Sequence, residues 1–242
     1  MTLDDILASL FPAGHAMQRG PHDTWHGTSD AGSDGEIALI GVANGTPFGI
    51  DAAILLAGHV LAVIEKGGSV PILLFVDTGI QNMTRRDELL GLNEYLGHLS
   101  KVLTLAAIKG HRTVGLLYGG AAGGAFIATA ASTQVLAALP GAAPSVMDLP
   151  SISRVTKLPL DALIEMAKST PIFAPGLESL FLTGAVTERW DPAKPLSGQF
   201  AALLRQAADM RDRRDELGLA RKGRLQAARI ARRVQAEVAL HA

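Results

Sequence analysis

The segment YGGAAGGAF, residues 118–126, combines four glycines with an apolar run on either side. Residues 111–120 have the composition of a buried strand, and residues 121–132 have the small side chains of a closely packed helix. Glycines at such a junction let the backbone turn sharply and let another group approach its peptide N–H groups. A helix start also carries unpaired N–H donors and the positive end of the helix dipole. The segment therefore predicts a strand–turn–helix unit whose turn binds a ligand or packs closely.

The same alternation of strands and helices extends in both directions from this unit. Apolar runs ended by turn residues predict strands over 36–45, 71–79, 111–120, 133–139 and 143–149, and helical periodicity predicts helices over 51–66, 85–110 and 121–132. Alternating strands and helices indicate a layered α/β fold with parallel pairing and right-handed crossovers.

The two ends of the chain differ from this middle part. Residues 1–35 show no strong period, so we expect an N-terminal extension before one domain over 36–242. Beyond Pro150 the pattern is helical, with helices expected over 160–169, 176–184, 196–217 and 219–240. The part over 196–242 is expected to form a helical C-terminal tail.

Composition excludes several classes of protein. The chain has 242 residues, 48% of them hydrophobic and 19% charged, so it can bury a large core and is not disordered as a whole. A net charge of -1 provides no general attraction for nucleic acid, and 5% aromatic residues are too few for a base-stacking surface. The absence of cysteine excludes disulfides, thiolate zinc sites and cysteine nucleophiles. The acidic N-terminal segment MTLDDILASLF lacks the cations of a secretory signal, and we expect a cytoplasmic protein.

Residues 113–147 carry no charge, a length that would suffice to cross a bilayer. Pro140, Pro144, several polar side chains and the glycine cluster interrupt the stretch. A strand and a short helix buried on all sides have the same composition, so we expect no membrane span.

Two clusters of ionisable residues allow a functional and a structural interpretation. His15, His22 and His26 suggest a zinc site, but their spacing is irregular and a surface loop without metal is the favoured interpretation. Acids alternate with the basic residues of 205–217, which is typical of a solvated helix face. The stretch 219–233 has no acid, so contact with an acidic carrier protein or a partner subunit stays open there.

Three kinds of site use a glycine-rich turn before a helix. A dinucleotide fingerprint would need glycine at Ala121 and an acid about 20 residues later, and the sequence has neither. A P-loop would need a following Gly-Lys-Ser/Thr, which is also missing. An oxyanion hole, in which N–H groups stabilise a developing enolate, remains possible, and so does close helix–strand packing.

A second turn lies at the carboxyl end of the preceding predicted strand, in FVDTGI, residues 75–80. Ligands of open parallel sheets bind beyond the carboxyl ends of strands, and Gly79 leaves room around the backbone there. The turns 78–80 and 123–125 therefore belong to consecutive strands at one edge, where one N–H group from each would form an oxyanion hole. No nucleophile motif is present, so chemistry here would be positioning and charge stabilisation.

The segments GTPFGIDAAILLAGHVLAVIEKGGSVPILLFVDTGIQ, HRTVGLLYGGAAGGAFIATAAS and LFLTGAVTERWDP resemble the carboxyltransferase branch of the crotonase superfamily. Within it, the chain is most similar to the gamma subunits of malonate decarboxylase, over about residues 36–240. This resemblance implies the α/β fold of crotonases, a ββα-superhelix, with a helical C-terminal region. Carboxyltransferases often carry Asp-Thr-Pro-Gly, whereas this chain has Asp77-Thr78-Gly79.

The resemblance also implies a function. Together with a beta subunit of the same fold, the chain would decarboxylate a malonyl thioester, held on an acyl-carrier subunit, to an acetyl thioester and CO2. An acyl-carrier transferase subunit would complete the complex. The carrier would bring a coenzyme-A-derived arm, and no metal or other cofactor would bind this chain directly.

The resemblance further assigns roles to the two turns. Gly123, Gly124 and Ala125, with Gly79 and Ile80, would supply backbone N–H groups to the departing carboxylate or to a biotin-side oxygen. Further substrate contacts would come from Thr78, Tyr118, Gly119 and Gly120. Two alternatives remain open: a biotin-dependent carboxyltransferase subunit, and a scaffold that completes the partner's site without a catalytic group.

Overall fold

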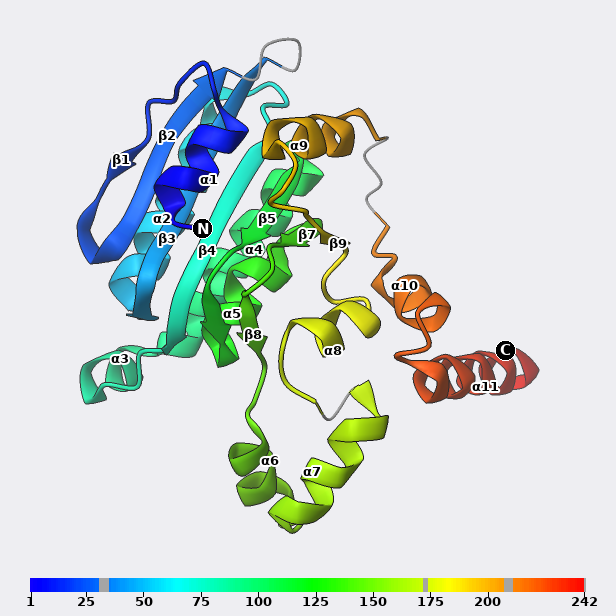
Figure 1. The fold of residues 1–242 in the computed structure, drawn as a ribbon. Helices are drawn as coiled ribbons and strands as arrows, with labels where there is room; N and C mark the ends of the chain where they lie inside the picture. The colour runs from blue at the N-terminus through cyan, green and yellow to red at the C-terminus, as the bar shows by residue number, and fades with distance from the viewer. Residues whose placement is uncertain (31–34, 172–173, 207–210, 242) are drawn as a thin grey trace. The chain divides into compact units, whose positions relative to one another are not determined.

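The computed structural model describes residues 1–30, 35–171, 174–206 and 211–241, drawn in Figure 1. The chain forms two compact units. Unit 1 comprises Met1–Val146 and Glu188–Met210, and unit 2 comprises Met147–Thr187 and Arg211–Ala242.

Unit 1 is built on a seven-stranded sheet in the order β1-β2-β3-β4-β5-β7-β9. The strands are β1 (Gln18–Arg19), β2 (Thr24–Asp30), β3 (Glu36–Phe48), β4 (Ile72–Gln81), β5 (Thr113–Leu117), β7 (Val135–Ala138) and β9 (Glu188–Arg189). Pairing is antiparallel from β1 to β3 and parallel from β3 to β9. The predicted layered α/β fold with parallel strands is therefore confirmed.

Helices cover both faces of this sheet (Figure 1). On one face lie α1 (Leu3–Leu10) and α9 (Leu196–Arg205), and on the other lie α2 (Ile50–Lys66) and α4 (Leu92–Ile108). The 13-residue strand β3 serves both faces, because Ile37 and Leu39 join the cluster under α1 and α9 while the alternate residues are also buried.

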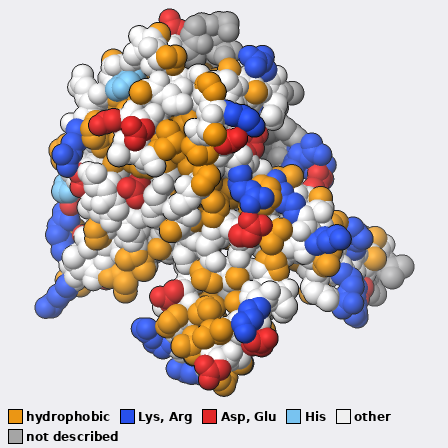
Figure 2. All heavy atoms as spheres, in the orientation of Figure 1, with side chains coloured by type: hydrophobic (Ala, Val, Ile, Leu, Met, Phe, Trp, Pro, Cys, Tyr) orange, Lys and Arg blue, Asp and Glu red, His pale blue; other side chains and the backbone are white. Residues whose placement is uncertain are grey.

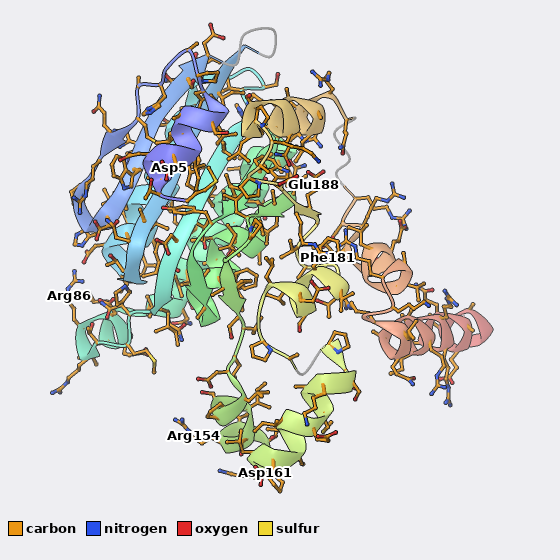
Figure 3. The ribbon with its side chains drawn as sticks, in the orientation of Figure 1. Asp5, Arg86, Arg154, Asp161, Phe181 and Glu188 are labelled. Atoms are coloured by element: carbon orange, nitrogen blue, oxygen red, sulfur yellow. The ribbon has the colours of Figure 1, made fainter. Side chains whose placement is uncertain are left out.

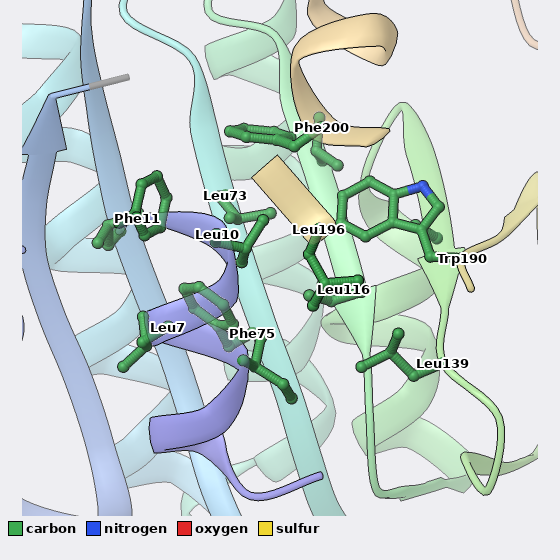
Figure 4. Close-up of a cluster of buried hydrophobic side chains, with 14 of the residues drawn as sticks. Leu7, Leu10, Phe11, Leu73, Phe75, Leu116, Leu139, Trp190, Leu196 and Phe200 are labelled. Carbon is green, nitrogen blue, oxygen red and sulfur yellow. The ribbon is translucent and has the colours of Figure 1, made fainter. Parts of the chain in front are cut away.

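The core under α1 and α9 contains Trp190 and the rings of Phe11, Phe75 and Phe200 (Figure 4). Phe11 meets Phe200 edge to face, with ring centroids 6.4 Å apart, and Trp190 lies 6.1 Å from Phe200. Leu7 and Leu10 of α1 lie over Phe75 of β4 in the same cluster. Burial of each such side chain contributes about 1.5–3 kcal/mol to the stability of the fold. Because α1 supplies Leu7 and Leu10 to this cluster, it is part of the core.

Within the N-terminal extension expected over 1–35, the structure describes residues 1–30 and Gly35. They supply α1 to the core and β1 and β2 to the sheet, with β2 paired to β3 from Thr24↔Val42 to Asp30↔Glu36. The expected boundary at residue 36 falls at the start of a strand that pairs with this segment.

The helix predicted over 121–132 is shorter and is preceded by a strand. Residues Gly120–Ala122 form β6, which pairs in parallel with β8 (Ala143–Ser145) in a separate two-stranded sheet. The helical part consists of α5 (Gly123–Ala128) and a 3-10 turn over Ala130–Ser132. The predicted strand 143–149 thus ends at Ser145 and lies outside the main sheet.

Two other predicted helices are divided. The helix expected over 85–110 is broken at Gly91, whose φ of 82° is left-handed, into α3 (Arg85–Leu90) and α4. The helix expected over 196–217 ends at Arg205, and α10 (Arg214–Ala220) follows in unit 2. No helix among the described residues is long and apolar enough to cross a membrane.

Unit 2 contains α6 (Leu149–Thr156), α7 (Leu160–Ser169), α8 (Leu177–Leu182), α10 and α11 (Leu225–His241). Arg221, which follows α10, links that helix to α8 and to the segment that follows α8. Its guanidinium donates to the carbonyls of Phe181, Val186 and Thr187, each at 2.8 Å, and lies 3.7 Å from the centre of the Phe181 ring. Phe181 is labelled in Figure 3. Arg221 is thus a structural anchor of unit 2.

Candidate active site

The carboxyl end of β4 lies between β3 and the β5–β6 turn. Parallel pairing continues to Thr46↔Thr78 and Phe48↔Gln81, and β4 also contacts β6. Thr78 is buried, and its hydroxyl donates to the Gly79 carbonyl at 2.8 Å. A Cβ at Gly79 would lie 2.9 Å from the Gly45 carbonyl oxygen, so only glycine lets β3 approach this closely.

Asp77 fixes the first half of the glycine-rich segment. Its Oδ1 accepts the backbone N–H of Gly120 at 2.9 Å. A Cβ at Gly119 would overlap the Asp77 carboxylate, and one at Gly120 would lie 2.8 Å from the Thr78 carbonyl oxygen. Gly119 and Gly120 therefore have a packing explanation, because they allow the turn to press against the end of β4.

Gln81 fixes the second half of the segment. Its Oε1 accepts the backbone N–H of Gly124 at 2.9 Å. Gly123 has a left-handed φ of 56°, and a Cβ there would overlap the same amide oxygen. Ile80 Cγ1 would lie 3.3 Å from that Cβ, so the turns 78–80 and 123–125 are neighbours, as the sequence predicted.

The sequence did not predict that a side chain of this chain would accept the hydrogen bond of the Gly124 N–H. A neutral amide oxygen occupies the place in which an oxyanion would accept this N–H group. Gln81 belongs to the site, and the only sequence signal for it was its position four residues after Asp77, on the buried strand that carries the Asp-Thr-Gly turn.

Tyr118, for which the sequence predicts a substrate contact, has a largely buried side chain. Its side chain packs against the hydrophobic core cluster, and its hydroxyl is buried without a hydrogen-bond partner among the described residues. Burial, and then the negative charge of Asp77, raise the pKa of Tyr118 above its ordinary value. The phenol therefore stays protonated and neutral at physiological pH.

A third turn, between β3 and α2, borders the same edge of the sheet. A Cβ at Gly49 would lie 2.5 Å from Asp87 Oδ2, so the start of α2 fits closely against α3. Arg86 links the two helices, with bonds of 2.7 and 3.0 Å to Asp51 and one of 3.2 Å to Asp87 (Figure 3). These side chains hold the segment that follows Gln81.

His15, His22 and His26 were considered as zinc ligands, with a surface loop as the favoured interpretation. No group of three or more His, Cys, Asp or Glu side chains that could hold a metal occurs in the described part of the chain. His15 Nδ1 accepts the Met17 N–H at 3.3 Å, and His26 stacks on His59 with ring centroids 4.1 Å apart. His26 and His59 line a cavity of about 370 Å³ between β2, β3 and α2 that contains no residue of the two turns.

Comparison with known proteins agrees with this architecture. A model of the malonate decarboxylase gamma subunit family matches residues 43–238. The malonyl-S-ACP:biotin-protein carboxyltransferase MADD of Malonomonas rubra is 31% identical over 153 residues, 61% of this chain and 51% of that protein. The chain thus spans about half the length of this curated relative.

Solved structures show the same fold. A Pseudomonas malonate decarboxylase hetero-tetramer in complex with coenzyme A contains a chain with a TM-score of 0.73 and 20% identity, over 96% of this chain and 98% of that one. The Pseudomonas MdcD–MdcE hetero-dimer gives 0.70 and 22% over the same shares. A transcarboxylase 12S structure gives 0.66 and 13% identity over 84% of this chain and 40% of that chain. The predicted crotonase-like fold is confirmed, and the chain belongs to the malonate decarboxylase gamma subunit family.

Proposed function

We propose that this chain is the gamma subunit of a malonate decarboxylase. Together with a beta subunit of the same fold, it would convert a malonyl thioester on an acyl-carrier subunit to an acetyl thioester and CO2. The observation that carries this proposal is the family match over residues 43–238, which includes both turns of the site. The proposal includes an acyl-carrier transferase subunit and a cytoplasmic location.

The chemistry requires a site that stabilises negative charge. When the bond between the α-carbon and the carboxylate breaks, its electron pair passes to the thioester enolate, CO2 leaves, and a proton then converts the enolate to the acetyl group. N–H donors aimed at a developing oxyanion in a dry site are worth about 3 kcal/mol each. The coenzyme-A-derived arm of the carrier would supply the thioester, in agreement with a relative that was crystallised with coenzyme A.

The two neighbouring turns are the proposed donors. Gly123, Gly124 and Ala125, with Gly79 and Ile80, would hold the departing carboxylate in place or donate to a biotin-side oxygen. The gain in turnover would come from those N–H groups that reach the oxygen on which negative charge develops, because the departing carboxylate loses its charge as CO2 forms. The N–H of Gly124 becomes available when the Gln81 amide moves away from it. Thr78, Tyr118, Gly119 and Gly120 are the proposed further substrate contacts, and they also shape the turns through their contacts within the chain.

A second candidate function is transfer of the carboxyl group to biotin. It is favoured by one relative, which is named as a carboxyltransferase acting on a biotin protein. Both functions would use the same donors, so the acceptor of the carboxyl group distinguishes them. Avidin inhibits a biotin-dependent complex and leaves a biotin-independent one active.

The proposal is tested by reconstituting the complex with its beta and carrier subunits and measuring CO2 and acetyl carrier. A Cβ at Gly124 would lie 3.0 Å from Leu96 Cδ1, and we expect Gly124→Val to lower turnover about a hundredfold, as for a lost oxyanion donor. Gly97→Val in α4, where a Cβ meets no atom within 4 Å, is the matched control.

Subunit assembly and thermal melting are followed in parallel for both variants. Near-normal turnover in an assembled Gly124→Val complex would contradict the donor role and favour the scaffold alternative. A wild-type complex that releases no CO2 and carboxylates no biotin would contradict the proposed function itself.

A further inference from the structure

The cavity of about 370 Å³ between β2, β3 and α2 lies apart from both turns, and we call it the α2 cavity. Figure 2 shows the side of the sheet that α1 and α9 cover, and α2 lies behind the sheet in that view. The cavity is lined by the first half of β3 and the last half of α2, whereas the turns follow the carboxyl ends of their strands. Its volume is typical of small-molecule sites.

The lining of the α2 cavity changes from its outer to its inner end. Because α2 runs back along β3 toward the start of β4, its last residues lie beside the first residues of β3. Residues two apart on a strand, and three or four apart on a helix, share one face. The lining therefore has an outer charged pair, a middle apolar pair and an inner imidazole pair: Glu36 with Lys66, Ala38 with Val63, and His26 with His59.

The inner pair consists of two stacked imidazole rings. The centroids of His26 and His59 are 4.1 Å apart, with an interplanar angle of 11°. Two positive charges at this separation repel each other strongly where water is partly excluded. Burial, and then the proximity of His26, lower the pKa of His59 below its ordinary value. An anion beside the two rings would compensate for both effects and favour protonation of the pair.

Charge inside the α2 cavity favours an anion at its inner end. The outer pair, Glu36 and Lys66, cancels at neutral pH, and the described part of the chain records no ion pair for either residue. Each proton bound by the inner pair makes the lining net positive. Thr28 lies two residues from His26 on β2 and also lines the cavity, so its hydroxyl adds a hydrogen-bond donor there.

Other charged groups on the surrounding elements do not neutralise the inner pair. Asp51 of α2 is bonded to Arg86, and Asp23 of the 3-10 turn Pro21–Asp23 is paired with Arg19. The remaining charged or histidine side chains on β2, this turn, α2 and α4, which packs against α2, are exposed: His22, Asp30, Glu65, Glu94, His98 and Lys101. Among the described residues that line the cavity, the only carboxylate is that of Glu36 at the outer end.

We propose that the α2 cavity binds a small carboxylate, whose apolar body lies against the middle pair and whose carboxylate meets His26 and His59. Binding is coupled to uptake of a proton by the histidine pair, so it strengthens on mild acidification. Lys66 offsets the charge of Glu36 at the mouth and thereby admits an anion. This inference goes beyond the proposed function and does not depend on it, because the cavity contains none of the proposed donors.

The first experiment uses isocaproate, a branched carboxylate, and isocaproamide, its neutral isostere, as probes of the full chain. Calorimetry is expected to give a Kd of about 1 mM for isocaproate at about pH 6, in keeping with the few atoms of the probe, and a Kd about fivefold higher at about pH 7.5. Titrations in two buffers of different ionisation enthalpy are expected to show uptake of about one proton. Isocaproamide is expected to bind more weakly than isocaproate and without pH dependence.

The second experiment changes the lining. His59→Gln is expected to remove the pH dependence of isocaproate binding, whereas His98→Gln, at an exposed histidine of α4 outside the cavity, is expected to keep it. Val63→Phe fills the middle of the cavity and is expected to abolish binding at both pH values. Lys66→Gln is expected to raise Kd about two- to threefold, and the exposed Lys101→Gln on α4 is expected to leave it unchanged.

Three results would overturn the inference. In the first, isocaproate binds wild type no more tightly than isocaproamide does at about pH 6. In the second, the pH dependence survives in His59→Gln or is lost equally in His98→Gln. In the third, Val63→Phe keeps its melting temperature and binds isocaproate as wild type does, which would place the ligand elsewhere. If His59→Gln fails to fold, proton uptake by wild type and the Val63→Phe result still decide the question.

Discussion

The glycine-rich turn over 118–124 and the basic stretch over 219–233 are both clusters of one residue type in the sequence. The members of the first share one environment in the structure, and the members of the second do not. In the turn, Gly119, Gly120, Gly123 and Gly124 all lie against side chains or backbone at the end of β4. In the basic stretch, Arg221 is tied to three carbonyls, while Arg229, Arg232 and Arg233 lie exposed on α11. A cluster of one residue type therefore does not define one role, and each member has to be assigned from its own contacts.

The largest effect on stability is expected for a substitution at Gly119, in the glycine-rich turn. A Cβ there would overlap the Asp77 carboxylate, which itself binds Gly120. We expect Gly119→Ala to destabilise unit 1 by about 3 kcal/mol, at the upper end for overpacking. Gly97→Ala, in the middle of α4 with open space around it, is expected to stabilise by about 0.5–1 kcal/mol. Chemical denaturation of the isolated chain measures both, and two changes of the same sign would contradict the packing explanation.

The basic stretch is separated into its parts by two single changes. Arg221→Gln would leave three carbonyls without their donor and remove the contact with Phe181, so we expect a loss of about 2 kcal/mol in the stability of unit 2. Arg229→Gln, on the exposed side of α11, is expected to stay within about 0.5 kcal/mol of wild type. Hydrogen exchange of α8 and α10 reports the effect locally. Equal protection in the two variants would mean that Arg221 does not anchor this unit.

The sequence predicted the features that depend on local pattern. Buried strands such as β4 and β5 are continuous apolar runs, and the turns at Gly79 and Gly123 follow strands whose carboxyl ends share one edge. Prediction from the sequence failed for features that depend on contacts between residues far apart in the chain. Residues 24–30 became a strand only because β3 offers an open edge, and Gln81 became part of the site only because Gly124 approaches it across 43 positions of sequence. Neither contact produces a periodic pattern in the local sequence.

The stability of the turn beside Gly79 is expected to depend on pH through Asp23. Asp23 accepts bonds from Thr46 at 2.6 Å and Asn44 at 2.8 Å, and it pairs with Arg19; together these lower its pKa from 3.8 to about 2. A depressed carboxyl pKa stabilises the fold fully above the unfolded value, and that stabilisation is lost as pH falls from about 4 to about 2. It matters for the site because Asn44 and Thr46 flank Gly45, whose carbonyl lies against Gly79.

We therefore expect Asp23→Asn to cost about 1 kcal/mol at neutral pH, after allowance for solvent screening of a partly exposed pair. The difference in unfolding free energy between wild type and variant should shrink as pH is lowered from about 4 to about 2. Urea titrations at several pH values give that difference directly. A difference that grows on acidification has the wrong sign and would contradict the assignment.

The smallest expected effect is also the one that separates packing from function in the glycine-rich turn. Gln81 Oε1 occupies the Gly124 N–H at 2.9 Å, so the substrate oxygen proposed for that donor has to displace it. Gln81→Ala removes the competitor without altering the backbone, and we expect KM for the malonyl carrier to fall about threefold, since one neutral hydrogen bond is worth about 1 kcal/mol. The value of kcat should change less than KM, because the donor is then available to the ground state and the transition state alike. Gln134→Ala is the matched control. The amide of Gln134 accepts the Thr113 N–H at 3.0 Å and belongs to neither turn, so its removal should leave KM unchanged. If Gln81 only holds the turn in place, its loss would instead lower kcat and the melting temperature together, and Gly124 would belong with the packing glycines.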